Sequence, residues 1–484
     1  MKKDLWRKVT LHNYRYIVGF SVLGILTVVL AAYRFWGIPN GLSPAEMTAA
    51  TVSGQFSFSA MTSSFSAHVA WLVGLPWTLI QMVSINIFGY STFAMRLPAV
   101  ILMVLSIAGL VVVGYKSFNK NIAIISGFLI VPSVIFMSLS RSGDGSAMTI
   151  FLMVAALLSA VSAMQCESDA MKGLAKIGVC VALCALIYQP GGLFILAVAI
   201  LISLLHPKTR LVIMSSKILN LIIATVVGVI FLAPLVIGLF ADPNAIVGGL
   251  LYSGQWSVDN IVGIGISLTG VKEGFVGGMV TPIVSVTFLV FAIIGLARSI
   301  QHFLSARSHL TLSSTLLFVG LAILQPSFVF LLFLPLCLLS MIGVDVVIHE
   351  WNGLFPKNPY PRVLATALIV VVIFLNLCTA ATHYMTANMY DSLAVSNYNP
   401  EFEAARSVLD GDDDVTLVVP VGQVDFYSNL GVNVSTKFGD GVNVVLNSVD
   451  NDVIPEKAIP AKIITGPSSE NPVLLRVYSI SLGS

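Results

Sequence analysis

Residues 97–114 read LPAVILMVLSIAGLVVVG, a stretch of 18 residues without a charged side chain. A helix needs about 20 such residues to cross the hydrocarbon core of a bilayer. The whole chain shares this character, because 57% of its 484 residues are hydrophobic and only 10% are charged. Soluble globular proteins carry about 25% charged residues. The composition therefore excludes a soluble enzyme, a disordered chain and a coiled coil, and it predicts an all-α polytopic membrane protein.

Ten further apolar stretches raise the prediction to about eleven transmembrane helices. They are residues 16–36, 122–139, 147–164, 177–188, 191–205, 218–240, 280–296, 310–324, 328–348 and 363–378. The first follows basic residues, as the apolar part of a signal peptide would. Its 21 residues are too many for that part, and no small-residue cleavage site follows, so we interpret it as a span.

The apolar segment 71–88 would be a twelfth span if it crossed the membrane. If it crossed, Lys116 and Lys120 would lie on the outer side, and every later loop would lie on the opposite side of the membrane. With eleven spans, 16 of the 25 Lys and Arg residues fall on the side of the N-terminus, and the positive-inside rule makes that side cytoplasmic. We therefore predict a multi-pass cell-membrane protein with a cytoplasmic N-terminus and an extracytoplasmic C-terminus. Segment 71–88 then lies along the outer interface or re-enters the membrane.

Charge also divides the chain into two predicted domains. Residues 1–381 hold 20 basic and 10 acidic residues, whereas residues 382–484 hold 5 basic and 13 acidic residues. We interpret the first part as a transmembrane domain and the second as a solvated extracytoplasmic domain, and neither indicates a nucleic-acid partner. In the second part, Asn399-Pro400-Glu401 predicts a helix start. Strands are predicted at 415–421, 432–437, 442–446, 462–465 and 473–480, which makes a small α/β domain.

Two of the predicted spans, 177–188 and 191–205, are unusually short. A tight outer hairpin of short helices would leave room for a cavity below the membrane surface, with Tyr188 and Gln189 as candidate substrate contacts. A plain helical hairpin is the alternative. Cys180 and Cys184 are four residues apart, which suits either a metal or redox pair or close packing of small side chains.

Ionisable residues near the outer edge of the membrane are functional candidates, because burying them in hydrocarbon is costly. Glu46 follows Ser43 by three residues and could instead complete a capping box. Asp144 follows Arg141 closely, so an Arg–Asp pair or a helix cap would also explain it. Arg96 could bind a phosphate or extend to the membrane interface.

Three motifs make residues 37–150 resemble the GT-C superfamily of membrane glycosyltransferases, the group of protein O-mannosyltransferases and aminoarabinose transferases. They are Gly41-Leu-Ser-Pro-Ala-Glu46 in the first outer loop (37–96), Phe88-Gly89 with Arg96-Leu-Pro98, and Ser140-Arg141 with Asp144. The architecture of residues 1–380 is similar as well. The chain departs from the family at Ala45, where the family has Asp, and at Ser66-Ala67-His68, where it has Pro-Pro-Leu.

This resemblance implies an enzyme of the cell envelope that moves a sugar from a polyprenyl-phosphate donor to a protein or glycan acceptor on the outer face. Such transfer needs a carboxylate to deprotonate the acceptor and positive charge at the leaving phosphate. We expect Glu46 to be the base and Asp144 a second carboxylate, and both to be ligands if a divalent metal ion takes part. His68 is a further candidate, either in the role of the missing family Asp or as a substrate contact.

The remaining substrate contacts are expected in the second outer loop, residues 141–144, and in the fourth, residues 241–279. Arg141 and Lys272 are candidate phosphate partners, and Tyr252, Trp256 and Asp259 are candidate sugar contacts, although the aromatic rings also suit interface anchors. A catalytically inactive relative that binds a sugar lipid or acts as a scaffold subunit is the alternative function. A secondary transporter is a third, which the absence of an internal sequence repeat disfavours.

Overall fold

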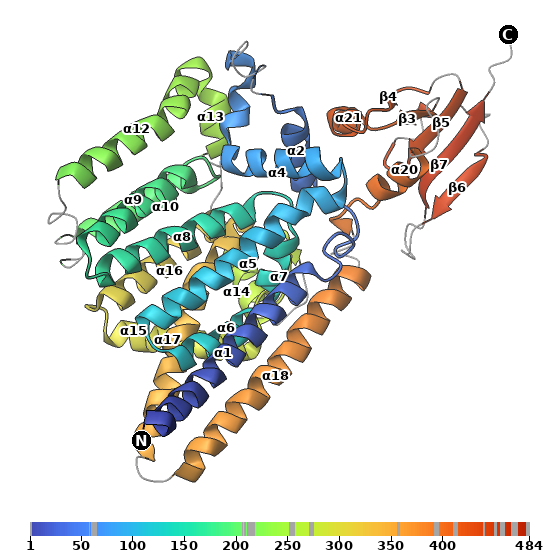
Figure 1. The fold of residues 1–484 in the computed structure, drawn as a ribbon. Coiled ribbons are helices and arrows are strands. Elements are labelled where there is room, and N and C mark those ends of the chain that lie inside the picture. Colours follow the sequence, from blue (N-terminus) through green and yellow to red (C-terminus); the bar gives the residue numbers. More distant parts are fainter. Residues whose placement is uncertain are drawn as a thin grey trace.

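Helices make up most of the computed structural model, and a small sheet lies near the C-terminus (Figure 1). The structure describes residues 2–57, 59, 65–205, 207, 210, 218–250, 257–270, 275–355, 359–391, 396–409, 415–438, 441–449, 453–454, 460–465 and 473–480. The all-α membrane fold with a C-terminal α/β domain is confirmed.

The elements of the helical part follow the chain in this order: α1 (Lys2–Ala32), α2 (Pro44–Gln55), η1 (Phe65–Leu72), α4 (Leu75–Phe88), α5 (Thr92–Ser117), α6 (Lys120–Ile130), α7 (Val134–Arg141), α8 (Ser146–Gln165), α9 (Asp169–Leu186), α10 (Gly192–Leu205), α12 (Ile218–Ala241), α13 (Pro243–Leu250), α14 (Val258–Thr269), β1 (Phe275–Val276), β2 (Met279–Val280), α15 (Val286–Gln301), α16 (Ala306–Leu324), η2 (Pro326–Leu332), α17 (Phe333–Leu354) and α18 (Pro359–Tyr390).

Seven of the described helices are long and apolar enough to cross a membrane, and the bent pair α6 and α7 would make eight. The other three predicted spans coincide with α9, α10 and α15, which do not meet this test, so the count of eleven stays a prediction. Most of segment 71–88 forms α4, a shorter apolar helix of 14 residues, and its first two residues end η1. Its length fits the prediction that it does not cross.

The predicted span 122–139 is not one straight helix. It is broken into α6 and α7, which meet at an angle of 71°. Pro132 lies at the break, and proline removes a backbone donor and clashes with the preceding turn. Ser133 then starts α7 afresh by accepting the backbone N–H of Phe136 (3.4 Å). The bend changes the direction of the chain, so that Arg141 ends the short helix α7 and the loop 142–145 follows it.

Close backbone contact joins α15 to α17 within the core. A Cβ atom added to Gly295 would lie 1.9 Å from the carbonyl oxygen of Leu339, and one added to Gly343 would lie 1.9 Å from that of Phe291. Only glycine allows this approach, which is how small residues pack helices where lipid offers no hydrophobic driving force.

The C-terminal part is a five-stranded sheet with two helices. Its elements are α20 (Glu401–Leu409), β3 (Val415–Val418), η3 (Val421–Gln423), α21 (Val424–Ser428), β4 (Asn433–Ser435), β5 (Gly441–Leu446), β6 (Lys462–Thr465) and β7 (Val473–Ile480). The strand order is β4-β3-β5-β7-β6, with β3 parallel to both neighbours and β7 antiparallel to both of its own. All five predicted strands are present, and the first is shorter than predicted because residues 421–423 form η3.

The sheet domain packs against the end of the bundle where α2 and α4 lie (Figure 1). Leu42 and Asn399 exchange two backbone hydrogen bonds of 3.0 and 2.8 Å. The carboxylate of Glu403 accepts from the hydroxyl and the backbone N–H of Thr92. One apolar cluster includes Met95 of α5 and Phe402 of α20. The domain is thus fixed beside the first residues of α5, where Arg96 lies.

Candidate functional site

Glu46 closes the capping box that starts α2. Ser43 Oγ accepts the backbone N–H of Glu46 (3.2 Å), and the Ser43 N–H donates to Glu46 Oε2 (2.8 Å). The sequence offered this arrangement as an alternative to catalysis, and the structure contains it. It places the Glu46 side chain at the N-terminus of α2, where a negative charge is favoured by the helix dipole.

The same carboxylate forms a buried ion pair with Arg96. Arg96 Nε donates to Oε1 (2.7 Å) and Arg96 Nη2 donates to Oε2 (3.0 Å), and both side chains are at most 2% exposed. The remaining guanidinium N–H groups donate to the carbonyl oxygens of Phe35, Pro39 and Gly41. The expectation that Arg96 extends to the interface is wrong, because Arg96 ties the loop after α1 to the start of α5.

A third donor completes the coordination of Glu46. The backbone N–H of Gly143 donates to Glu46 Oε1 (2.9 Å), so each carboxylate oxygen accepts two hydrogen bonds. A carboxylate has about four lone-pair sites, and all of them are used here. Glu46 would have to lose one of these bonds before it could take a proton from a substrate.

Asp144 lies one residue beyond Gly143 and is exposed. Its Oδ1 accepts the hydroxyl of Ser142 (2.8 Å) and the backbone N–H of Ser146 (3.0 Å). Its Oδ2 accepts no hydrogen bond from the described residues. Gly143 therefore separates two carboxylates of different character: Glu46 is buried and saturated, and Asp144 is open to solvent with one free oxygen.

Arg141 does not pair with Asp144, because Glu46–Arg96 is the one salt bridge among the described residues. The Arg141 guanidinium is buried and donates to the carbonyl oxygens of Leu30 (2.7 Å) and Tyr33 (3.2 Å) at the C-terminal end of α1. Such carbonyl groups attract cations. It also lies 5.0 Å from the ring centroid of Tyr384, and its Nε has no acceptor within the described part of the chain.

Tyr398 joins this cluster from the segment after α18. Tyr398 is half-buried, and its phenol interacts electrostatically with the carboxylates of Glu46 and Asp144. Its ring contacts the ring of Phe275 edge to face, with 6.2 Å between the centroids. Burial, followed by the negative charge of Glu46, raises the pKa of Tyr398 well above the ordinary value for tyrosine. The phenol therefore stays protonated at neutral pH and can donate a hydrogen bond.

A second group of polar atoms lies around the turn between α9 and α10. The carbonyl oxygen of Tyr188 accepts the backbone N–H of Gly74 (2.6 Å) just before α4. The hydroxyl of Tyr188 donates to the carbonyl oxygen of Phe231. Gln189 is 1% exposed, and its Nε2 lacks an acceptor among the described residues. Tyr188 is thus held by the fold, whereas the Gln189 amide nitrogen has no hydrogen-bond acceptor among the described residues.

Trp77, which the sequence interpretation did not select, has the same property. Its indole is 3% exposed, and its Nε1 lacks an acceptor within the described ranges. A Cβ atom added to Gly145 would lie 3.1 Å from Trp77 Cγ, so the indole packs on the loop that carries Asp144. Backbone hydrogen bonds join the start of α4 to the turn that carries Gln189, because the Trp77 N–H donates to the carbonyl oxygen of Gly74 (2.9 Å) and the Gly74 N–H donates to that of Tyr188. In the sequence, Gly74-Leu-Pro-Trp77 indicates only the start of a helix, with proline in its first turn.

The other predicted contacts lie on separate elements or outside the described residues. Asp259 is exposed in the first turn of α14, and His68 belongs to η1. Three predicted substrate contacts, Tyr252, Trp256 and Lys272, lie outside the described residues.

A metal site does not fit the residues that were expected to form it. Both Glu46 oxygens already accept N–H groups, two of them from a guanidinium cation. The described chain also contains no group of three His, Cys, Asp or Glu residues able to hold an ion. Cys180 and Cys184 have their sulfur atoms 4.0 Å apart, and Cys180 donates to the carbonyl oxygen of Ala224 (3.3 Å). We therefore assign no chemical step to a metal.

Comparisons with known proteins match the chain to membrane glycosyltransferases. A family model described as dolichyl-phosphate-mannose-protein mannosyltransferase matches residues 73–253. ArnT from Cupriavidus metallidurans, in the apo state, aligns over 96% of this chain and 98% of its own, with a TM-score of 0.58 and 11% identity. The same protein bound to undecaprenyl phosphate aligns over 97% and 98%, with a TM-score of 0.58 and 10% identity.

The archaeal oligosaccharyltransferase AglB from Archaeoglobus fulgidus has a similar fold. Its complex with an inhibitory peptide and a dolichol-phosphate aligns over 88% of this chain and 64% of its own, with a TM-score of 0.51 and 12% identity. Another AglB structure, with Zn and sulfate, gives a TM-score of 0.50 and 10% identity over 88% and 67%. No curated protein matches by sequence. Together these findings support the resemblance to the GT-C superfamily, and they confirm its fold.

Proposed function

We propose that this chain, which has the fold of the GT-C membrane glycosyltransferases, transfers a sugar from a polyprenyl-phosphate donor to an acceptor on the outer face of the membrane. Residues 1–381 would bind the donor, with the N-terminus in the cytoplasm. Residues 382–484 would lie outside and contact the acceptor, a protein or a glycan. The family model and the structural match to ArnT with undecaprenyl phosphate support the donor class.

The observation that carries the proposal is the pair of buried N–H donors, Trp77 Nε1 and Gln189 Nε2, without acceptors in the described chain. A buried donor without a partner costs about 1–3 kcal/mol, and nearly all such groups in proteins are satisfied by protein, water or ligand. Both donors fall in the segment that the family model matches. Phosphate oxygens of the donor lipid would supply the missing acceptors.

The residues would act as follows. Asp144 Oδ2 takes the proton from the acceptor hydroxyl, whose oxygen then attacks the anomeric carbon. The bond between that carbon and the phosphate oxygen breaks, and the electron pair leaves with the polyprenyl phosphate. The N–H groups of Trp77 and Gln189 and the charge of Arg141 stabilise this leaving group. Glu46 holds Gly143, and with it Asp144, through its bond to the Gly143 N–H.

A second function, a sugar-lipid-binding subunit without catalytic activity, is favoured by one observation. The family Asp is replaced by Ala45, and the adjacent Glu46 has no free lone pair for a proton. In that case Trp77 and Gln189 would still bind the lipid phosphate, and Asp144 would only cap α8. Binding and turnover must therefore be measured separately.

Removing either unpaired donor is expected to weaken binding of undecaprenyl phosphate by about 10- to 100-fold, since a hydrogen bond to a charged group contributes about 1.5–3 kcal/mol. The variants are Trp77→Phe and Gln189→Leu, and native mass spectrometry of the purified chain measures the affinity. Neither variant breaks a protein hydrogen bond that the structure shows, so the only expected cost to the ligand-free protein is the packing that Trp77→Phe loses.

The matched control is Trp351→Phe, whose indole N–H already donates to the carbonyl oxygen of Pro361 (3.0 Å). Its affinity for undecaprenyl phosphate should equal that of the wild type. Unchanged affinity in both Trp77→Phe and Gln189→Leu would contradict the proposed phosphate site.

A further inference from the structure

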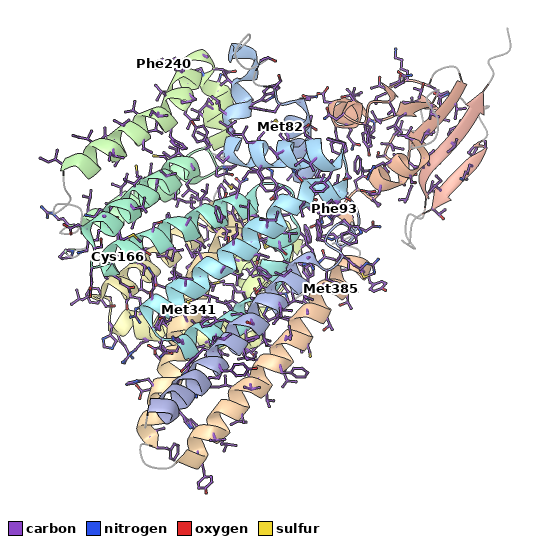
Figure 2. All side chains as sticks on the ribbon, viewed as in Figure 1. Met82, Phe93, Cys166, Phe240, Met341 and Met385 are labelled. Atoms are coloured by element: carbon purple, nitrogen blue, oxygen red, sulfur yellow. The ribbon has the colours of Figure 1, made fainter. Side chains whose placement is uncertain are left out.

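A cavity of about 620 Å³ lies between α8 and α9. Its lining is mostly apolar and includes Phe151, Leu152, Ala155, Leu158, Val181 and Ala182. Cys166 also lines it, and Figure 2 shows Cys166 at one end of the bundle and Phe93, beside the candidate site, at the other. The cavity is therefore separate from the proposed donor site.

The positively charged side chain of Lys116 lies at one end of this apolar cavity. Lys116 Nζ donates to Ser162 Oγ (2.7 Å), and both residues belong to the lining. No carboxylate of the described residues pairs with Lys116, since their one salt bridge is Glu46–Arg96. Among the described residues no carboxylate lies within 4.0 Å of the Lys116 ammonium group, and the acidic residues at the connection between α8 and α9, Glu167 and Asp169, are exposed.

We propose that this cavity binds an anionic phospholipid of the leaflet at the Lys116 end of the bundle. One acyl chain would fill the space between α8 and α9, and the phosphate would accept hydrogen bonds from Lys116 and Ser162. Basic pockets between transmembrane helices bind anionic headgroups in this way. Small side chains line the cavity, among them Ala155 and Ser159 on α8 and Gly178 on α9. Gly178 packs against Ser159, because a Cβ atom added to it would lie 3.0 Å from Ser159 Oγ, so the acyl chain would lie along the seam of the two helices and not pass through it.

The apolar lining and the charged Lys116 end of the cavity together favour this one occupant. A free phosphate would satisfy Lys116 but would leave the apolar lining in contact with water. A neutral lipid would fill the lining but would leave the Lys116 ammonium group with no anion within 4.0 Å among the described residues. Only a molecule with an apolar chain and an anionic headgroup satisfies both, and phospholipids are the abundant membrane molecules of that kind.

Native mass spectrometry of the full-length protein, with phosphatidylglycerol, phosphatidylcholine or undecaprenyl phosphate added, tests the proposal. We expect phosphatidylglycerol to be retained over phosphatidylcholine. Lys116→Gln should weaken its binding by about five-fold, the effect of one lysine near an anionic headgroup. Ala155→Phe should abolish binding by filling the cavity. The control is Lys120→Gln, because Lys120 lies over the rings of Tyr16 and Tyr115 and does not line the cavity.

Three results would overturn the proposal. They are equal retention of the two phospholipids, unchanged phosphatidylglycerol binding in Lys116→Gln, and displacement of phosphatidylglycerol by undecaprenyl phosphate, which would make the cavity part of the donor site. If Ala155→Phe does not fold, the comparison of Lys116→Gln with Lys120→Gln decides, since each removes one charge and keeps a polar side chain.

Discussion

Replacing Arg96 with methionine is expected to lower the free energy of unfolding by about 3–5 kcal/mol, because removal of one partner leaves the other charge buried and unpaired. Here that partner is Glu46, which is 2% exposed. The substitution also frees the carbonyl oxygens of Phe35, Pro39 and Gly41, which lose their donor. Denaturant titration of the purified protein in detergent measures the loss.

The control for this prediction is Arg307→Met. Arg307 also bonds a backbone carbonyl, that of Ser117 (2.7 Å), but it has no carboxylate within 4.0 Å among the described residues. Arg307→Met should lower the free energy of unfolding by less than half as much as Arg96→Met. The double variant Glu46→Met with Arg96→Met should recover much of the loss, since no unpaired charge remains. A loss below about 1 kcal/mol in Arg96→Met would show that the ion pair does not hold the loop, since exposed pairs contribute that little.

Replacing Asp144 with asparagine is expected to lower sugar transfer by about 10²- to 10⁴-fold, the usual contribution of a general base. Asparagine keeps an acceptor for the Ser146 N–H (3.0 Å), so the start of α8 should form normally. Transfer from a polyprenyl-phosphate sugar and the melting temperature of the same preparation are the two measurements. A large loss of transfer with an unchanged melting temperature is the expected result.

Asp242→Asn is the matched control, because Asp242 also caps a helix start, through the Ala245 N–H (3.0 Å). It should leave both transfer and melting temperature unchanged. Glu46→Gln should differ from both, since it removes the charge opposite Arg96 and therefore lowers the melting temperature together with transfer. Normal transfer in Asp144→Asn, or lost transfer with intact stability in Glu46→Gln, would return the role of base to Glu46.

Most of the fold could be predicted from the sequence because its determinants are local. Hydrophobic length identifies the helices, and alternation and turn residues identify the strands of the acidic domain. The bend at Pro132 could have been predicted from the same residues, since proline breaks a helix wherever it falls. The approach of Gly295 to the backbone of α17 could not, because it depends on a partner 44 residues away along the chain.

The candidate site was predicted less well because its contacts are not local. The capping box of Ser43 and Glu46 spans three residues and was visible as an alternative. The partner of Glu46, Arg96, lies 50 residues further along the chain, and Gly143 lies 97 residues further. Tyr398 reaches the same cluster from the opposite end of the chain.

The unpaired donors show the same limit in another form. Gln189 was selected because it lies in a short turn, whereas Trp77 was passed over as part of an apolar segment. A sequence contains no information on which buried N–H group lacks an acceptor, because that depends on every neighbour at once. The two donors became a candidate phosphate site only when their surroundings were known.

The central claim is that the protein turns over a polyprenyl-phosphate sugar. The most direct measurement is the release of undecaprenyl phosphate from a panel of undecaprenyl-phosphate sugars, with the purified protein in vesicles that also contain membrane extract as a source of acceptor. We predict release from at least one sugar by the wild type, and release at least 100-fold slower in Asp144→Asn. Tight binding of every donor without any release would contradict the claim and establish the protein as a sugar-lipid-binding subunit.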